Sequence, residues 1–243
     1  MITIVEPTID RAWLAATRAT LDNGMEIFNL IVLVTPGIEP TDETAMRSVV
    51  DHSLRARKLQ DTQTVANTIF PAGLARLSAA AIYDTYRTKS FPVLRRLRQN
   101  QRGTYFMRLI ANSHYPALNP LDEVVQKMRH EIERGRGIVR CAYELPVYDA
   151  TSDGKMRMGF PCLSHISLKI DDAHLHLTAL YRNQRQFERA YGNYLGLARL
   201  QRFICRETGL AVGDLVCHAT HAELDLGRQK AGRLLDNCSA VTL

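Results

Sequence analysis

The chain has 243 residues, of which 46% are hydrophobic and 23% are charged. This length is enough for one large hydrophobic core, and the scattered glycines and prolines leave no linker, repeat or low-complexity segment that would divide it. We therefore expect a single domain over residues 1–243. The formal net charge of +6 indicates anionic partners, which include nucleic acid, phosphate-bearing small molecules and the acidic interior of a cell.

The sequence offers neither an export signal nor a membrane span. Residues 1–7 lack the basic start and long apolar stretch of a secretory signal, and the longest apolar runs, such as residues 30–34, are too short to cross a bilayer. The five cysteines have no short paired spacing, so neither a disulfide framework nor a CxxC zinc site is indicated. We expect a cytoplasmic protein with reduced thiols and no membrane partner.

The first elements expected along the chain are a helix and a buried strand. Thr8 and Asp10 are capping residues for an apolar helical pattern that ends at Asn23 and the glycine after it. The apolar run 30–34 predicts a short buried strand over residues 29–35, which Pro36 ends.

The middle of the chain is expected to be mainly helical. Residues 41–60 are polar and weakly helical, and the Phe-Pro pair at 70–71 separates them from a second helix over residues 74–86. A surface helix follows over residues 121–133, where apolar residues repeat on one face. The next strand is expected within residues 138–145.

The C-terminal part changes to a two-residue period. Residues 164–170 and 175–179 each alternate apolar and polar side chains, which predicts an antiparallel hairpin with one buried face. A long helix over 187–207, a short strand over 215–218 and a charged C-terminal helix complete the pattern. The order of elements predicts an α+β fold in which helices pack on a mixed, largely antiparallel β-sheet.

A possible nucleophile precedes the predicted hairpin. Phe160 and Pro161 come directly before Cys162, so the thiol lies at the start of a strand. A nucleophilic cysteine needs nearby positive charge to form the thiolate. Candidate sources of that charge are Arg136, Arg140, Arg182 and Arg185. Taken alone, a Pro-Cys pair is more typical of a structural cysteine, because free cysteines usually pack as small apolar residues.

Four separated motifs give Cys162 a context. In chain order they are Pro161-Cys162, Leu180-Tyr181-Arg182-Asn183, Gly192-Asn193-Tyr194-Leu195-Gly196-Leu197 and Gly213-Asp214-Leu215-Val216. Their order and ungapped spacing resemble the C-terminal half of thymidylate synthases, within the superfamily that also contains pyrimidine-nucleotide hydroxymethylases. Upstream, Ala12-Trp13 with Asn23-Gly24, the segment 103–108 and the segment 134–139 resemble the archaeal-type and phage-type members.

The resemblance implies a reaction and a set of partners. The Cys162 thiolate would add to carbon 6 of a pyrimidine, so that carbon 5 can attack a one-carbon unit from 5,10-methylenetetrahydrofolate. Arg182 would bind the phosphate of a pyrimidine nucleotide monophosphate, and Asn193 would pair with the base edge, which favours uracil because cytidylate hydroxymethylases tend to have aspartate there. Tyr105 and Arg108 belong to the Tyr-x-x-Arg segment.

The resemblance also implies an assembly. In the family, an arginine pair at the position of Arg134 and Arg136 crosses a two-fold interface to the partner's phosphate site. A homodimer with shared active sites is therefore expected.

The sequence departs from the family at several site positions. Asn183 replaces the serine and Arg185 replaces the aspartate of the phosphate-binding turn. Glu223 and Asp225 fall where the family has a His-x-Tyr pair that binds the sugar hydroxyl. These two carboxylates are either a remodelled sugar pocket or a solvated helix start, and Arg185 is either a ligand contact or a surface charge. Residues 69–108 contain no convincing counterpart of the family's catalytic glutamate and tryptophan.

Histidines offer a second chemistry. His174 and His176 share a strand face, and His218 and His221 lie close in sequence, but strand histidines are more often solvent-facing, so no metal is expected. His218 or His221 is a candidate general base, because the strand that contains them borders the expected cleft.

The catalytic candidates are Cys162, Tyr105 and His218, and the substrate-binding candidates are Arg182, Asn193, Arg136, Arg108, Asn183, Arg185, Glu223 and Asp225.

Three functional hypotheses remain. The leading one is a thymidylate synthase-like enzyme that transfers a methyl or hydroxymethyl group to carbon 5 of a pyrimidine nucleotide. The second is a nucleotide-binding protein of the same fold without folate-dependent transfer. The third, a nucleic-acid-binding module, has only the net charge in its favour: the arginine-rich run 95–98 contains no aromatic residue and is more typical of a solvated helix face, so nucleic acid is not an expected partner.

Overall fold

The computed structural model describes residues 1–36, 44–111, 115, 117–135 and 139–241. In chain order its strands and α-helices are β1 (Ile2–Glu6), α1 (Ile9–Asp22), β2 (Glu26–Val34), α2 (Ala45–Arg55), α3 (Thr62–Asn67), α4 (Ala79–Thr85), α5 (Phe91–Leu94), α6 (Tyr105–Ile110), α7 (Pro120–Arg134), β3 (Tyr143–Pro146), α8 (Ala150–Asp153), β4 (Leu163–Asp171), β5 (His174–Tyr181), β6 (Gln184–Arg185), α9 (Tyr191–Thr208), β7 (Ala211–Glu223) and α10 (Arg228–Ala240). A π-helical turn, Gln186–Ala190, leads directly into α9.

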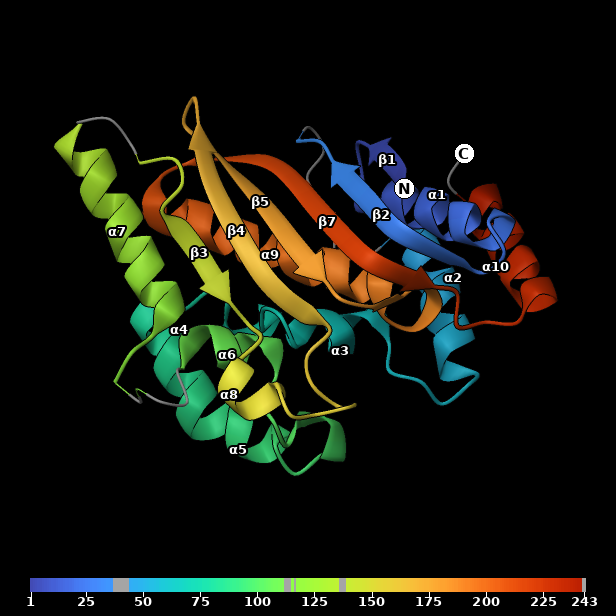
Figure 1. The fold of residues 1–243 in the computed structure, drawn as a ribbon, viewed down its shortest axis with the longest axis horizontal. Coiled ribbons are helices and arrows are strands. Elements are labelled where there is room, and N and C mark those ends of the chain that lie inside the picture. Colours follow the sequence, from blue (N-terminus) through green and yellow to red (C-terminus); the bar gives the residue numbers. More distant parts are fainter. Residues whose placement is uncertain (37–43, 112–114, 116, 136–138, 242–243) are drawn as a thin grey trace.

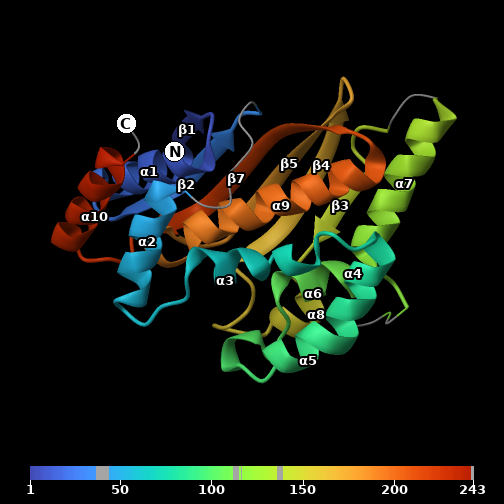
Figure 2. The ribbon, with the colours of Figure 1, turned by 180° about the vertical axis from the view of Figure 1, so that it is seen from behind.

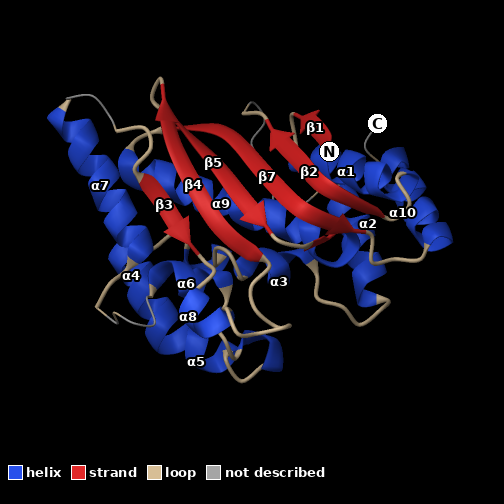
Figure 3. Ribbon diagram, in the orientation of Figure 1, coloured by secondary structure: helices blue, strands red, loops and turns tan. Residues whose placement is uncertain are grey.

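The strands form one mixed sheet, shown in Figures 1 and 3. Their order is β1-β2-β7-β5-β4-β3, with the short β6 also paired to β7. The pairs β2–β7, β3–β4 and β4–β5 are antiparallel, whereas β1–β2, β5–β7 and β6–β7 are parallel. The predicted α+β class with helices packed on a mixed sheet is confirmed.

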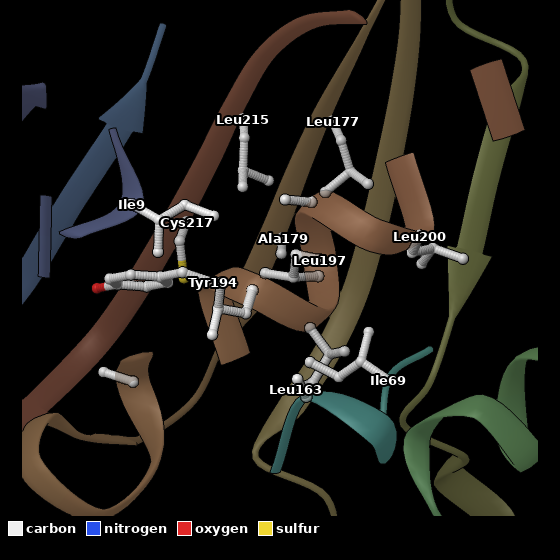
Figure 4. Packing of buried hydrophobic residues seen from close by; sticks show 14 of the residues in the cluster. Ile9, Ile69, Leu163, Leu177, Ala179, Tyr194, Leu197, Leu200, Leu215 and Cys217 are labelled. Atoms are coloured by element: carbon white, nitrogen blue, oxygen red, sulfur yellow. The ribbon is translucent and has the colours of Figure 1, made fainter. Parts of the chain in front are cut away.

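One face of the sheet is covered by helices, and α9 crosses that face (Figure 2). Side chains that alternate on β5 and β7 point toward α9 because successive residues of a strand face opposite sides. Figure 4 shows Leu177, Leu215 and Cys217 from these strands packed against Tyr194 and Leu197 of α9. This layer forms the centre of the hydrophobic core.

Close contact between α9 and α3 depends on two glycines. A Cβ atom at Gly192 would lie 2.5 Å from Val65 Cβ and 2.8 Å from the Thr62 carbonyl oxygen, and one at Gly196 would lie 2.8 Å from the Ala66 carbonyl oxygen. Only glycine allows the two helices to approach so closely. The contact fixes α3, and with it the residues just before α3, relative to the first turn of α9.

The opposite face of the sheet has no described helix over it (Figure 1). Ile31, Leu180 and Val216 are half-buried on this open face, and Phe28 is 64% exposed. These apolar side chains lie beside polar ones such as His218. Among the described helices, none combines the length and apolar character of a membrane span.

The structure refines several predicted elements. The first helix, the hairpin and the surface helix lie close to their predicted ranges, whereas β1 was not predicted. The helix expected over 74–86 begins only at Ala79, and the strand expected within 138–145 is Tyr143–Pro146. The last strand has 13 residues, Ala211–Glu223, instead of the four predicted.

Candidate functional site

The loop before β4 places Cys162 at the edge of the helix-covered face. The Arg182 backbone N–H donates to the Cys162 carbonyl at 2.9 Å. The Arg182 side chain then donates from Nε to the Pro161 carbonyl and from Nη2 to the Phe160 carbonyl, each at 3.0 Å, and its guanidinium lies 3.7 Å from the centre of the Phe160 ring. Arg182 therefore fixes the backbone on both sides of the thiol.

Electrostatics distinguish Cys162 from the buried cysteines. Burial raises the pKa of the Cys162 thiol, and the positive charges of Arg182, Arg185 and Arg189 act against that rise. Burial also raises the pKa of Cys205 to about 11 and that of Cys217 to about 12, with no arginine acting on either. Cys162 is half-buried rather than sealed in the core, so it combines access with nearby positive charge.

Tyr105 lies beside Cys162 at the start of α6. The Leu163 amide N–H donates to the Tyr105 hydroxyl oxygen over 3.5 Å, and the Tyr105 and Tyr181 rings meet edge-on with their centres 6.5 Å apart. Burial and the neighbouring Cys162 raise the pKa of Tyr105 to about 12. The phenol therefore stays protonated at neutral pH and can donate a hydrogen bond.

A carboxylate joins two of the arginines near the thiol. Arg185 Nη1 donates to Glu188 Oε2 and Arg189 Nη2 donates to Glu188 Oε1, each at 2.8 Å. Arg189 also donates to Gln60 Oε1 at 2.7 Å, just before α3. The side chain of Glu188 is only 12% exposed, so this carboxylate offsets part of the positive charge available to a ligand.

A second chain of hydrogen bonds extends from Asn183 to the open face. Asn183 Nδ2 donates to Glu223 Oε1 at 2.9 Å, and its Oδ1 lies 2.7 Å from His221 Nδ1. His221 Nε2 lies 3.2 Å from Glu26 Oε2, and Arg185 Nε lies 3.6 Å from Glu223 Oε1. The charge of Glu223 also acts on the Cys162 thiol.

Glu223 and Asp225 are not a solvated helix start, because α10 begins only at Arg228. Glu223 is the last residue of β7. Asp225 Oδ1 accepts from the Phe187 amide at 2.9 Å and thereby caps the π-helical turn. Burial raises the pKa of Asp225, and the backbone amides act against the rise. Its carboxylate is therefore committed to the backbone.

The remaining candidates lie in different surroundings. Asn193 is 4% exposed on the first turn of α9, and no described residue forms a hydrogen bond with its side chain. Arg108 forms a two-bond ion pair with Asp153, at 2.6 and 3.0 Å. His218 points to the open face, where its Nε2 lies 3.1 Å from Asn29 Oδ1.

Arg136 lies outside the described residues. On the hairpin, His174 Nδ1 lies 2.8 Å from the Asp172 carbonyl and His176 Nδ1 lies 3.4 Å from Asp214 Oδ2. No three metal-ligating side chains gather within the part of the chain that the structure describes.

Comparison with known proteins places these observations in a family context. No protein-family model matches the chain. A Methanothermobacter thermautotrophicus protein named "Putative thymidylate synthase" is 30% identical over 121 residues, which are 50% of this chain and 50% of that protein. The structure matches thermostable thymidylate synthase A from Bacillus subtilis with a TM-score of 0.56 and 12% identity, over 94% of this chain and 84% of that one.

The chain has a thymidylate synthase-like fold. The resemblance seen in the sequence is confirmed for the fold, and the sequence match spans about half the length of the curated relative.

Two site residues of this thymidylate synthase-like fold were missed from the sequence. Arg189 and Glu188 lie in the π-helical turn, where neither matches a family motif that the sequence displayed. Their spacing was the available signal: Glu188 and Arg189 follow Arg185 by three and four residues, the separation at which helical side chains meet.

The described structure contains no clear counterparts of the residues expected to bind a folate. The single tryptophan, Trp13, is fully buried and donates from Nε1 to the Gln186 carbonyl at 2.7 Å, so it cannot stack on a ligand. Asp84, the one acidic residue within 69–108, is exposed on α4. The residues present thus do not reproduce the carboxylate and tryptophan that the family uses near the one-carbon donor.

Proposed function

We propose that this protein transfers a one-carbon group, methyl or hydroxymethyl, to carbon 5 of a pyrimidine nucleotide through a covalent adduct on Cys162. The main support is the position of Cys162, which is accessible, adjacent to Tyr105 and acted on by three guanidinium groups. The other thiols with raised pKa values are buried and have no such neighbours.

The proposed chemistry uses these groups in order. The Cys162 sulfur forms a bond to carbon 6 of the pyrimidine, and the electron pair of the carbon 5–carbon 6 double bond moves to carbon 5 and the carbonyl beside it. Carbon 5 would then take up the one-carbon unit and lose its proton, with the donor nitrogen as the leaving group. A hydride from the donor would complete a methyl group, or a water would complete a hydroxymethyl group, as the Cys162 sulfur leaves and the ring double bond is restored. Tyr105, as a protonated phenol, would hold a water that accepts the proton from carbon 5.

Substrate binding is assigned to groups near the thiol. Arg182 and Arg185 would bind the phosphate, because guanidinium groups match phosphate oxygens in pairs. Asn193 would pair with the base, since its buried amide has both donors and acceptors without described partners. Asn183 and Glu223 would contact the sugar.

A second copy of the chain is the proposed partner on the open face of the sheet. The half-buried apolar side chains of that face and the exposed Phe28 would be covered in a homodimer. The family resemblance implies that Arg136 would reach the active site of the partner in such a dimer. Sedimentation velocity should give a dimer for the wild type and a monomer for Phe28→Glu; a wild-type monomer at 50 micromolar would contradict this assignment.

The one-carbon donor is a separate proposal. The superfamily resemblance implies 5,10-methylenetetrahydrofolate, but the family's carboxylate and tryptophan have no counterparts at the described site. We therefore assign no residue to the folate. Equilibrium binding of methylenetetrahydrofolate to the protein saturated with deoxyuridylate tests the donor directly.

The transfer is tested by release of tritium from carbon 5 of deoxyuridylate in the presence of methylenetetrahydrofolate. Cys162→Ala and Cys162→Ser should abolish release while the far-ultraviolet circular dichroism spectrum is unchanged. Cys141→Ala removes an exposed thiol and is the matched control, which should keep wild-type activity. Release that survives in Cys162→Ala would refute the role of this thiol.

The alternative is a nucleotide-binding protein of the same fold that does not transfer a one-carbon group. Two observations favour it: burial raises the pKa of Cys162, and Glu188 already occupies two of the nearby guanidinium groups. Calorimetric titration with deoxyuridylate and cytidylate would show nucleotide binding without folate binding. Tritium release from the wild type would eliminate this alternative.

A further inference from the structure

The positive charge of the protein is concentrated in one segment. Residues 85–121 contain no Asp or Glu and seven Arg or Lys. Since the chain has 31 basic and 25 acidic residues, the rest of it has 24 basic against 25 acidic residues. The net charge of +6 therefore arises from this segment alone, so its surroundings are electrostatically different from the rest of the surface.

Three arginines of this segment are exposed and unpaired. Arg95, Arg96 and Arg98 follow α5, and their side chains form no ion pair or hydrogen bond with any residue that the structure describes. Uncompensated guanidinium groups this close together repel one another. An anionic ligand bound among them would remove this repulsion.

A second segment adds positive charge beside them. Arg102 Nη1 lies 2.7 Å from Met156 Sδ, which places the end of the arginine-rich segment against the loop 154–161. This loop contributes the exposed Lys155 and Arg157. Figures 1 and 2 both show α5, α6 and α8 gathered on one side of the molecule, away from the sheet. We call Arg95, Arg96, Arg98, Arg102, Lys155 and Arg157 the basic lobe.

An exposed aromatic side chain lies beside the loop that contributes Lys155 and Arg157. Tyr148 is 37% exposed, and its ring centre lies 5.9 Å from that of Phe160 in an edge-on pair. Phe160 belongs to the same loop as Lys155 and Arg157. The run 95–98 contains no aromatic residue, and Arg182 lies over the Phe160 ring. The exposed ring of the basic lobe is therefore that of Tyr148, whose hydroxyl would lie 3.3 Å from a Cβ atom at Gly154 of the loop 154–161.

We propose that the basic lobe binds single-stranded nucleic acid. Positively charged surfaces with aromatic side chains are the features that proteins use for this ligand: guanidinium groups bind successive phosphates, and bases stack on the rings. Arginine predominates over lysine in the lobe, which suits phosphate oxygens bound in pairs. This inference goes beyond the proposed transfer reaction and does not depend on it.

An anionic bilayer fits the lobe less well. Peripheral membrane binding of this kind uses an amphipathic helix long enough to place an apolar face in the lipid. Here α5 has only four residues, and the cations come from two loops rather than from one helix face. Nucleic acid needs no such continuous apolar face.

The test is fluorescence anisotropy of a labelled 20-nucleotide single-stranded pyrimidine oligonucleotide, titrated with the full chain at several salt concentrations. The variant Arg95→Ala/Arg96→Ala/Arg98→Ala should lose about tenfold or more in affinity at low salt. Its salt slope, which is the slope of log affinity against log salt concentration, should become shallower by about 2, because each lost phosphate contact contributes about 0.7. The matched control is Arg228→Ala/Lys230→Ala/Arg233→Ala, which removes three exposed cations from α10. The control should bind as the wild type does.

Two further measurements make the result decisive. Tyr148→Ala should weaken binding severalfold without changing the salt slope, because it removes stacking and no charge. Vesicles of phosphatidylserine and phosphatidylcholine should bind more weakly than the oligonucleotide. Equal losses in the two triple variants, or binding to the vesicles but not to the oligonucleotide, would overturn the proposal. The Cys162→Ala variant should keep full oligonucleotide affinity, so the outcome is independent of the transfer reaction.

Discussion

The close approach of α9 and α3 leads to a quantitative prediction for Gly192→Ala. The new Cβ would lie 2.5 Å from Val65 Cβ and 2.8 Å from the Thr62 carbonyl oxygen. Neither atom is the free end of a flexible side chain, so relief requires a shift of the helix. Overpacking of this kind costs about 1–3 kcal/mol, whereas replacing glycine by alanine inside a helix stabilises it by about 1 kcal/mol.

Gly232→Ala on α10 isolates the steric contribution. A Cβ at Gly232 would have no atom within 4 Å, so this variant should gain the helical preference without a clash. In urea unfolding, Gly192→Ala should therefore be less stable than Gly232→Ala by about 1–3 kcal/mol. Equal stability of the two variants would refute the close packing of α9 on α3.

Three further predictions concern groups around the site. Asp153→Asn leaves the Arg108 guanidinium without its anion and should cost about 3–5 kcal/mol at pH 7. Burial acts to raise the pKa of Asp153, but Arg108 and a backbone amide outweigh it and lower that pKa. The stabilisation from the ionised carboxylate is therefore complete above the unfolded pKa of about 4 and is lost as the pH falls through the lower folded pKa. Urea unfolding between pH 3 and 7 should show the stabilities of the wild type and of Asp153→Asn converging below about pH 4. Glu188→Gln frees two guanidinium groups and should lower the pKa of Cys162, which is measured as faster alkylation by iodoacetamide at pH 7; an unchanged pH profile would contradict this. Trp13→Phe leaves the Gln186 carbonyl without its buried donor. Urea unfolding should show a loss of stability of about 1–3 kcal/mol. A loss below about 0.5 kcal/mol would contradict this and show that water replaces the indole.

The sequence predicted those elements whose patterns are local. The hairpin of β4 and β5 follows from strict alternation around a two-residue turn, and the first helix follows from its Thr8 cap. The strand β7 was predicted too short because the alternation changes phase: Ala219 and Ala222 are both buried although they are three positions apart. The change of phase occurs opposite Asn29 of the neighbouring strand β2, whose backbone has a positive φ of 59°. A pattern analysis of one strand cannot detect a distortion that two strands share.

Local sequence patterns predicted only part of the candidate site. Cys162 and Arg182 were found because their motifs occur at a fixed separation, and the fold places them in direct backbone contact. The pairing of Arg185 and Arg189 through Glu188 depends on the π-helical turn, and the contacts of Asn183 depend on how β6 meets β7. The basic lobe also depends on the fold, because Arg102 meets Met156 of the loop 154–161 only in three dimensions.

The account depends most on whether Cys162 forms a covalent bond with a pyrimidine ring. Intact-protein mass spectrometry after incubation with 5-fluoro-2′-deoxyuridylate, with and without methylenetetrahydrofolate, measures this directly. We predict a mass increase equal to the nucleotide, extended by the folate when it is present, with the modified peptide containing Cys162 and no adduct in Cys162→Ala. An unmodified wild-type protein at saturating nucleotide, or an adduct on a different cysteine, would contradict the central proposal.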